Sequence, residues 1–159
     1  MRYFEDVEEG QEFELGSRRM EREEMIAFAR EYDPQPFHVD EEAARRTPFG
    51  GLIASGWQTL AVMARLGVDG MMSRLVGLGS PGVDEVRWLR PVRAGDTLRG
   101  RGRVLRTRAS KRDPRRGTVW FEIELVREED GERVLLVTLP MFIARRPGSS
   151  GAAGGDPAG

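Results

Sequence analysis

SGWQTLAVMARL, residues 55–66, is the stretch that decides the fold of this chain of 159 residues. Ser55 and Gln58 fit the S-x-x-Q pattern of a capping box, which predicts a helix that starts at Gly56. From Trp57 to Leu66 this helix is apolar on almost every side, and such a helix is buried inside a protein. The rest of the chain must therefore supply a layer that encloses it.

The second half of the chain can supply that layer as four strands. We predict them at residues 83–89, 97–107, 118–127 and 134–144, with turn-like segments between them. Apolar residues alternate with more polar ones along the third of these strands, as in a sheet with one wet face. We therefore predict an α+β fold in which an antiparallel sheet wraps around one long central helix.

The first half should be mostly helical after an initial strand or hairpin over Phe4–Leu15. Apolar spacing predicts a helix over 22–32. Asp33-Pro34 should end it, because the residue before a proline is disfavoured in the α region. Asp40 is a typical N-cap for a short helix over 41–46.

The whole fold should lie within a single domain, residues 1–146. The remaining segment, 147–159 (PGSSGAAGGDPAG), has no large apolar side chain. It cannot bury enough surface to offset the entropy lost on ordering, so we predict that it is disordered.

Composition excludes several classes of site and partner. The formal net charge is -1, so nothing attracts the chain as a whole to nucleic acid or to an anionic membrane. Without cysteine there is no disulfide, thiolate zinc site or cysteine nucleophile, and a single histidine rules out a histidine-rich metal site. The acidic start lacks a signal peptide, and the apolar runs are too short to span a membrane. We expect a cytoplasmic protein that needs no metal or redox cofactor.

The segment Tyr32–Asp40 (YDPQPFHVD) contains the most informative polar residues. Asp33 and His38, the only histidine, lie five positions apart in a loop stiffened by two prolines. Fully extended they would be ~17 Å apart, so the loop must fold back if the two are to share one water. A carboxylate and an imidazole suit general acid–base catalysis near neutral pH. A helix-stopping aspartate and a structural histidine are the alternative.

Three segments resemble one known family. Asp33–His38 (DPQPFH) resembles the motif D-x-N-P-(apolar)-H of MaoC-like (R)-specific enoyl-CoA hydratases and dehydratases. Gly51–Trp57 (GLIASGW) resembles the loop that opens the family's central helix. Val86–Val92 (VRWLRPV), followed by Ala94–Leu98 (AGDTL), resembles its strand–PV–GD–strand signature. The resemblance runs in the correct order over most of residues 1–145.

Three positions depart from the family pattern. Gln35 stands in place of the motif's asparagine and is one methylene longer. Ser55 stands where many members have histidine, and Ala64 stands where some hydratases carry a serine two turns into the central helix. These departures leave the acid–base pair intact but do not favour short-chain crotonyl-CoA as the substrate.

The resemblance implies a hot-dog fold and an enzyme, an enoyl-CoA hydratase or acyl dehydratase. Family members form dimers whose sheets join, and the acyl thioester enters near the dimer interface. Asp33 and His38 would activate a water that adds to C3 of a trans-2-enoyl thioester, with CoA as part of the substrate. The backbone N–H of Gly56 would polarise the thioester oxygen, because the first N–H groups of a helix lack partners inside it. A homodimer or a dimer-based oligomer is expected.

Other residues are candidates for substrate binding. Ser55 and Trp57 flank Gly56. Phe49, Trp88 and the pair Met71-Met72 could line a pocket or belong to the core. Lys111 and Arg112 lie in a basic stretch, 106–116, that could meet the phosphates of CoA. A solvated hairpin is the alternative for that stretch.

Two other functions remain open at this level. The hot-dog architecture also serves thioesterases, and some of its members are non-catalytic subunits that bind an acyl thioester beside an active partner. The acyl group, CoA versus acyl-carrier protein, and the direction of the reaction are not determined by the sequence.

Overall fold

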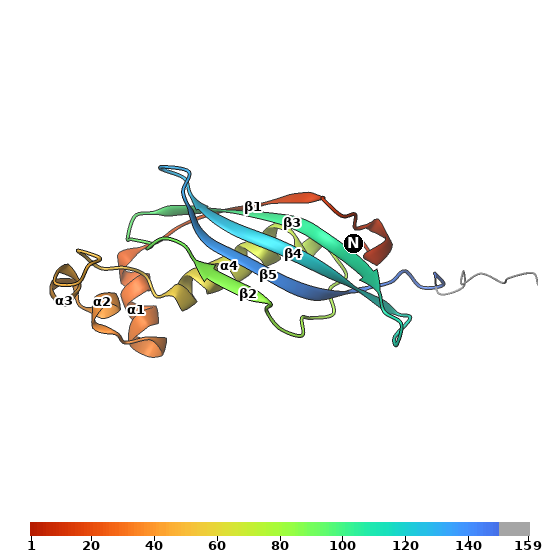
Figure 1. Cartoon of the computed structure of the whole chain (residues 1–159), viewed down its shortest axis with the longest axis horizontal. Coiled ribbons are helices and arrows are strands. Elements are labelled where there is room, and N and C mark those ends of the chain that lie inside the picture. Colours follow the sequence, from red (N-terminus) through yellow and green to blue (C-terminus); the bar gives the residue numbers. More distant parts are fainter. Residues whose placement is uncertain (150–159) are drawn as a thin grey trace, which may run out of the picture.

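The computed structural model describes residues 1–149, and its main feature is one five-stranded antiparallel sheet (Figure 1). The strand order is β1-β3-β4-β5-β2. The strands are β1 (Glu12–Arg19), β2 (Glu85–Trp88), β3 (Thr97–Ala109), β4 (Arg116–Arg127) and β5 (Arg133–Ala144). The predicted antiparallel sheet is confirmed, and its four predicted strands in the second half lie within three residues of their predicted ends.

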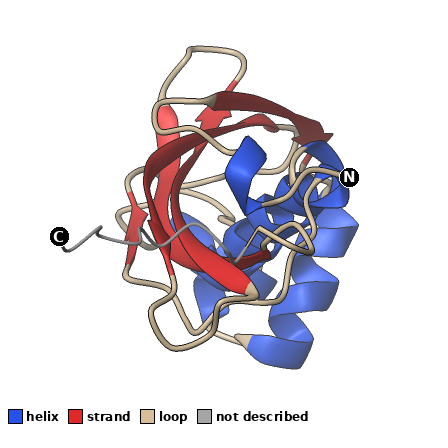
Figure 2. Ribbon diagram, turned by 90° about the vertical axis from the view of Figure 1, so that its right-hand side faces the viewer, coloured by secondary structure: helices blue, strands red, loops and turns tan. Residues whose placement is uncertain are grey.

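Helix α4 (Gly56–Gly70) lies in the hollow of this sheet, as the end view in Figure 2 shows. Its inner face carries Val62, Met63 and Leu66, which belong to the same buried cluster as the inward side chains of all the long strands. The helix crosses close to β1, because a Cβ at Gly70 would lie 2.4 Å from the Cα of Leu15. The predicted α+β hot-dog fold with a long central helix is thus confirmed.

The predicted burial of this helix is incomplete in the single chain. Trp57, Ala61, Ala64 and Val68 form an exposed stripe along α4, and Trp57 and Val68 are 58% and 53% exposed. The spacing of four, three and four residues places them on one side of the helix. The helix packs on β1, β3 and β4, so the sheet covers only the opposite side.

The start of the chain also differs from the prediction. Phe4–Asp6 is a 3-10 helix, η1, rather than part of a strand or hairpin, and β1 runs on to Arg19. The carboxylate of Asp6 accepts a hydrogen bond from the backbone N–H of Tyr3 at 2.9 Å, which closes the turn. A second 3-10 helix, η2 (Met72–Arg74), follows α4.

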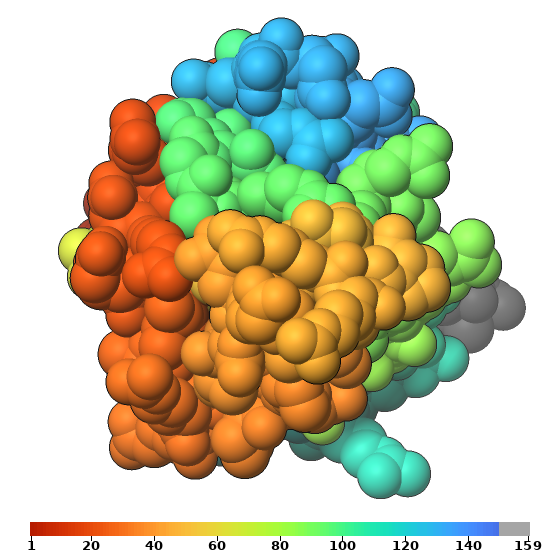
Figure 3. All heavy atoms as spheres, turned by 90° about the vertical axis from the view of Figure 1, so that its left-hand side faces the viewer, coloured from red at the N-terminus to blue at the C-terminus, as the bar shows by residue number. Residues whose placement is uncertain are grey.

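Three short helices cover one end of the sheet (Figures 1 and 3). Helix α1 (Arg22–Tyr32) has the predicted bounds and ends at Asp33. Helix α3 (Glu41–Arg45) ends one residue earlier than predicted, and Asp40 caps it as expected, since its Oδ1 accepts hydrogen bonds from two backbone N–H groups. The single turn α2 (Pro36–Val39) was not predicted.

Most of the segment predicted to be disordered lies outside the described residues. Within it, Pro147 and Gly148 form a turn, and the backbone N–H of Ser149 donates to the carbonyl oxygen of Arg146 at 3.1 Å. For 150–159 the prediction of disorder stays a prediction. Among residues 1–149, no helix has the length and hydropathy that a membrane crossing requires.

Candidate active site

The loop between α1 and α3 folds back on itself and brings the acid and the imidazole together. Two backbone hydrogen bonds tighten it, from the N–H of Gln35 to the carbonyl of Asp33 and from the N–H of His38 to the carbonyl of Gln35, at 2.8 and 2.9 Å. His38 Nε2 therefore lies 3.2 Å from Asp33 Oδ2. The predicted fold-back of this loop is confirmed.

The imidazole of His38 is buried and held in one orientation. Its Nδ1 lies 2.9 Å from the carbonyl oxygen of Ile53. A carbonyl oxygen can only accept, so Nδ1 carries the hydrogen of this bond. Nε2, the nitrogen that faces Asp33, is then the atom that can take or give a proton.

The carboxylate of Asp33 accepts hydrogen bonds at both oxygens. Gln35 Nε2 donates to Oδ1 at 2.8 Å, and Ser55 Oγ donates to Oδ2 at 2.7 Å. Burial raises the pKa of the Asp33 carboxyl, but the hydrogen bonds from Gln35 and Ser55 and the charge of His38 outweigh it and hold that pKa below its usual range. The group is therefore a carboxylate at neutral pH.

The pair faces a mainly apolar cavity of about 420 Å³. Asp33, His38, Trp57 and Trp88 are among its lining residues, and the two tryptophan rings lie edge to face with centroids 5.4 Å apart. The other lining residues are Gln35, Phe49, Ile53, Ala54, Gly56, Thr59, Leu89, Arg90, Pro91 and Val92. A mainly apolar pocket with a few converging polar groups is typical of a ligand site.

Gly56 lines this cavity, and its backbone N–H group is unpaired within residues 1–149. The next three amides are satisfied: Trp57 N donates to Ser55 Oγ at 3.3 Å, and the amides of Gln58 and Thr59 donate to the Ser55 carbonyl at 3.0 and 3.1 Å. Within residues 1–149 the Gly56 N–H has no acceptor. The predicted capping box forms only in part, because the side-chain oxygen of Gln58 is buried without a partner in this described part of the chain.

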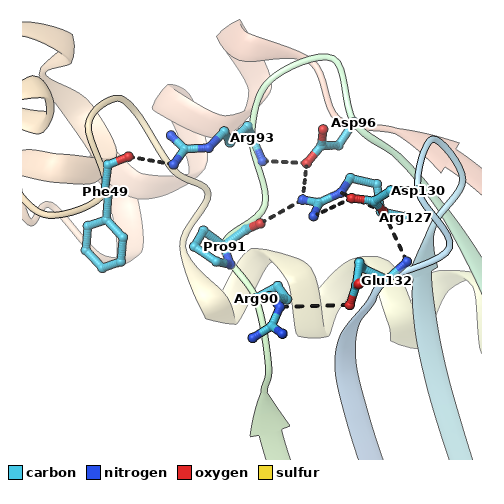
Figure 4. A network of polar contacts seen from close by, with 8 residues as sticks. All are labelled: Phe49, Arg90, Pro91, Arg93, Asp96, Arg127, Asp130 and Glu132. Carbon is cyan, nitrogen blue, oxygen red and sulfur yellow. Dashed lines mark hydrogen bonds and ion pairs between the residues drawn. The ribbon is translucent and has the colours of Figure 1, made fainter.

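A polar network holds the segment after β2, which forms one wall of the cavity (Figure 4). The backbone N–H of Arg93 donates to Asp96 at 2.9 Å, and its guanidinium donates to the Phe49 carbonyl. Arg127 donates to the carbonyl of Pro91 at 3.2 Å and pairs with Asp96 and Asp130. These contacts fix Pro91 and Val92 against the loop that carries Phe49.

The structure brings together some of the predicted site residues and separates others. Asp33, His38, Gly56 and Trp57 line the cavity, as do Phe49 and Trp88. Ser55 is fully buried and is not among the lining residues; it contacts Asp33 instead. Met71 and Met72 belong to the core rather than to the cavity.

Lys111 and Arg112 lie far from this cavity in the same chain. They belong to the β3–β4 hairpin, at the opposite end of the sheet from α1 to α3 (Figure 1). Strand β3 starts beside the end of β1 and runs for 13 residues before the hairpin, which at ~3.3 Å per residue is roughly 40 Å. A separate cavity of about 460 Å³ lies beside the hairpin. Its lining includes the basic residues Arg108, Lys111, Arg112 and Arg116.

Some site residues could not be found from the sequence. The Ile53 contact is made by a backbone carbonyl, which no side-chain pattern reveals. Gln35 was noticed only as a departure from the family motif, and Arg90 only as a letter in the signature VRWLRPV. Thr59 gave no signal beyond its place on an apolar helix.

A family model and a solved structure both indicate one family. The family model described as MaoC like domain matches residues 5–124. The crystal structure of the MaoC-like dehydratase from Rhodospirillum rubrum superimposes with a TM-score of 0.83 and 39% identity, covering 92% of this chain and 99% of that one.

Curated relatives match over shorter segments. The (R)-specific enoyl-CoA hydratase of Rhodospirillum rubrum is 34% identical over 99 residues, 62% of this chain and 66% of the relative. The uncharacterized protein YdeM of Bacillus subtilis is 45% identical over 60 residues, 38% of this chain and 43% of the relative. The matches thus span less than two thirds of either relative's length.

Proposed function

Because the chain belongs to the MaoC-like domain family, we propose that it reversibly hydrates a trans-2-enoyl thioester to a 3-hydroxyacyl thioester. The observation that carries the proposal is the pairing of His38 Nε2 with Asp33 Oδ2 at 3.2 Å on the wall of an apolar cavity. An acid–base pair at such a wall can hold a water against an apolar acyl chain. The similarity to the (R)-specific enoyl-CoA hydratase of Rhodospirillum rubrum supports the same chemistry.

The reaction needs a water, a proton carrier and a group that stabilises negative charge. Asp33 and His38 together bind and activate the water whose oxygen adds to C3. The electrons of the C2–C3 double bond move toward the thioester oxygen, and the proton removed from water is returned at C2. The unpaired N–H of Gly56 donates to that thioester oxygen, where charge develops. Its place in the first turn of α4 adds the favourable field of the helix N-terminus.

The aromatic residues of the cavity suit the apolar part of the substrate. Phe49, Trp57 and Trp88 are between 37% and 58% exposed in the single chain, which is unusual for large apolar side chains. They surround the space in front of Asp33 and His38. We assign them to contact with the acyl chain or the pantetheine arm.

A second copy of the chain is the proposed partner. The exposed stripe Trp57, Ala61, Ala64 and Val68 lies on the side of α4 that the sheet leaves open, and β2 is an edge strand. Two copies related by a two-fold axis could pair their β2 edges antiparallel and cover both stripes. The reversal of strand direction would bring the β3–β4 hairpin of one copy to the end that carries Asp33 and His38 of the other. Lys111 and Arg112 would then meet CoA phosphates in the partner's site.

The test is the loss of enoyl-thioester absorbance over a panel of trans-2-enoyl-CoAs of different length and branching. We expect activity from the wild type and a loss of roughly 10²- to 10⁴-fold in both Asp33→Asn and His38→Ala. Glu23→Gln, which removes an exposed carboxylate of α1, serves as the control and should keep full activity. Full activity in Asp33→Asn would disprove the assignment. Release of free CoA without addition at C3 would favour the thioesterase alternative.

A further inference from the structure

Ser55 joins two segments that are 22 residues apart in the chain. It is fully buried at the start of α4 and does not line the cavity. Its hydroxyl accepts a hydrogen bond from the Trp57 N–H at 3.3 Å and lies 2.7 Å from Asp33 Oδ2. Because the N–H already donates to this oxygen, the hydroxyl hydrogen is directed at Asp33. Asp33 Oδ2 is thus the acceptor in the contact.

Asp33 Oδ1, the other carboxylate oxygen, also accepts a hydrogen bond. Gln35 Nε2 donates to Oδ1 at 2.8 Å from the residue just before α2. The extra methylene of glutamine, compared with the asparagine of the family motif, gives the side chain the reach to turn back over two positions. Donors therefore bind Asp33 from both sides, and hydrogen bonds to the charged form favour that form.

The hydrogen bonds of His38 leave one of its ring nitrogens free to face Asp33. Its Nδ1 hydrogen is bound by the Ile53 carbonyl, so only Nε2 is free to exchange a proton, and Nε2 faces Asp33. The groups that face Asp33 are Gln35 before α2, His38 on α2 and Ser55 at the start of α4. The one other charged side chain in the lining of the cavity, within the described residues, is Arg90 from the segment after β2.

We propose that Ser55 and Gln35 are positioning residues that hold Asp33 as an anion facing His38, and that His38 Nε2 is thereby the atom that carries the proton. The inference rests on the proposed hydratase function for its meaning in catalysis. In hydration, Nε2 takes the proton from water as the oxygen bonds to C3 and returns it to C2. Asp33 stays ionised throughout, orients the water and stabilises the imidazolium.

The experiment compares the pH dependence of kcat/KM in the wild type, Ser55→Ala and Gln35→Ala. Nε2 must be unprotonated to take the proton from water and Asp33 must be ionised, so kcat/KM falls more steeply with decreasing pH once Asp33 is protonated as well as Nε2. Removing a donor raises the pKa of Asp33, so this steeper fall should begin about one pH unit higher in each variant, since one hydrogen bond to a charged group is lost. We also expect kcat to fall more than KM rises, because neither side chain is assigned to bind the acyl chain.

Ser55→Ala also removes the N-cap of α4, so a variant that removes a different helix cap serves as the control. Asp40→Ala removes the N-cap of α3, whose Oδ1 accepts from Glu42 N and Ala43 N, and leaves all partners of Asp33 in place. It should lower the free energy of unfolding by an amount similar to Ser55→Ala without moving the pH at which the steeper fall begins. If Ser55→Ala behaves like Asp40→Ala in both respects, Ser55 is only a helix cap and the proposal is wrong.

A second readout does not depend on activity. The chain has one histidine, so the ring resonances of His38 can be followed by NMR without ambiguity. At low pH they should show an inflection from the titration of Asp33, and that inflection should move to higher pH in Ser55→Ala. If the wild type hydrates no thioester, the proposed function fails but this titration still decides the positioning role. An inflection that stays in place in both variants overturns it.

Discussion

The indole Nε1 of Trp88 donates a hydrogen bond of 2.8 Å to the carbonyl oxygen of Gly56. The contact ties the end of the edge strand β2 to the first residue of α4, at the wall of the cavity. It requires glycine, because a Cβ at position 56 would lie 2.6 Å from that same nitrogen. Gly56, which is proposed to bind the thioester oxygen through its N–H, therefore also positions Trp88 through its carbonyl oxygen.

Gly56→Ala should displace the indole of Trp88 and reduce kcat/KM by at least tenfold. Overpacking at a rigid contact of this kind costs about 1–3 kcal/mol of stability as well. Gly67→Ala, in the same helix, is the matched control, since its Cβ would meet only a side-chain atom of Ile123 at 3.9 Å. The control should keep its activity and gain up to about 1 kcal/mol, because alanine favours the helix. Equal activity of the two variants would contradict the role of Gly56.

The steeper part of the acid side of the wild-type rate profile, where Asp33 is protonated as well as His38 Nε2, should begin below the usual titration range of aspartate. The pKa of Asp33 is lowered in the folded protein by its hydrogen bonds and by His38, which outweigh burial. The anion therefore persists as the pH falls, and the loss of activity that is due to Asp33 occurs only when the pH passes through this lowered pKa. The measurement is kcat/KM against pH, with circular dichroism at each pH to confirm that the protein is folded. A steeper fall that begins above the range of ordinary aspartates would contradict the prediction.

Lys111→Ala combined with Arg112→Ala should raise the KM for enoyl-CoA about five- to tenfold, as expected for the loss of partly screened charge contacts to phosphate. The KM for the corresponding enoyl-pantetheine, which lacks the nucleotide phosphates, should not change. Arg101→Ala combined with Arg103→Ala removes the same charge from β3 and should leave both KM values as they are. An unchanged KM for enoyl-CoA would remove the hairpin from the binding site.

A mixed dimer shows whether the hairpin acts across the interface. One chain carries Asp33→Asn, and the other carries the Lys111 and Arg112 substitutions. If the hairpin serves the partner's site, the intact Asp33 is served by the intact hairpin, and the mixed dimer has the normal KM. A raised KM would mean that the hairpin acts within its own chain.

Ala61→Glu combined with Ala64→Glu should convert the protein to monomers. Both positions lie on the exposed stripe of α4, which the proposed dimer would bury. Carboxylates buried there without partners would make dimer formation unfavourable. The molar mass by light scattering reports the change, and thermal unfolding should show that the monomer is folded. A monomeric wild type would exclude the proposed dimer.

Glu5→Gln should destabilise the protein at neutral pH and much less at very low pH. Burial raises the pKa of Glu5, but hydrogen bonds from the Arg146 backbone, Arg145 and Ser149 outweigh it and lower the pKa to about 2. Because the folded-state pKa lies below the unfolded one, the stabilisation is present above the unfolded value and is lost as the pH falls through about 2. We expect roughly 1 kcal/mol at pH 7, a modest value because the pair is partly exposed. Urea unfolding of both proteins at pH 7 and pH 2.5 measures the difference.

Local signals in the sequence determined most of the elements. The spacing of apolar residues in 22–32, the proline after Asp33 and the capping aspartate at 40 act within one or two turns of the chain, and all three were predicted correctly. The family motifs also led to Asp33, His38 and Gly56 before any geometry was known. Phe4–Asp6 was mispredicted, because the turn is closed by a hydrogen bond from the backbone N–H of Tyr3 to the side chain of Asp6, which the spacing of apolar residues does not reveal.

The sequence by itself determined the elements of this protein and the residues that resemble a hydratase motif, because those depend on neighbours in the chain. Only the tertiary structure decided how they act together. The bond from Ser55 to Asp33, the Ile53 carbonyl that orients His38, and the indole of Trp88 on Gly56 join residues that are 22, 15 and 32 positions apart. The exposed stripe on α4 likewise arises because the sheet covers one side of the helix, which no periodicity in residues 55–66 could show. Contacts at such separations are set by how the sheet and helices pack.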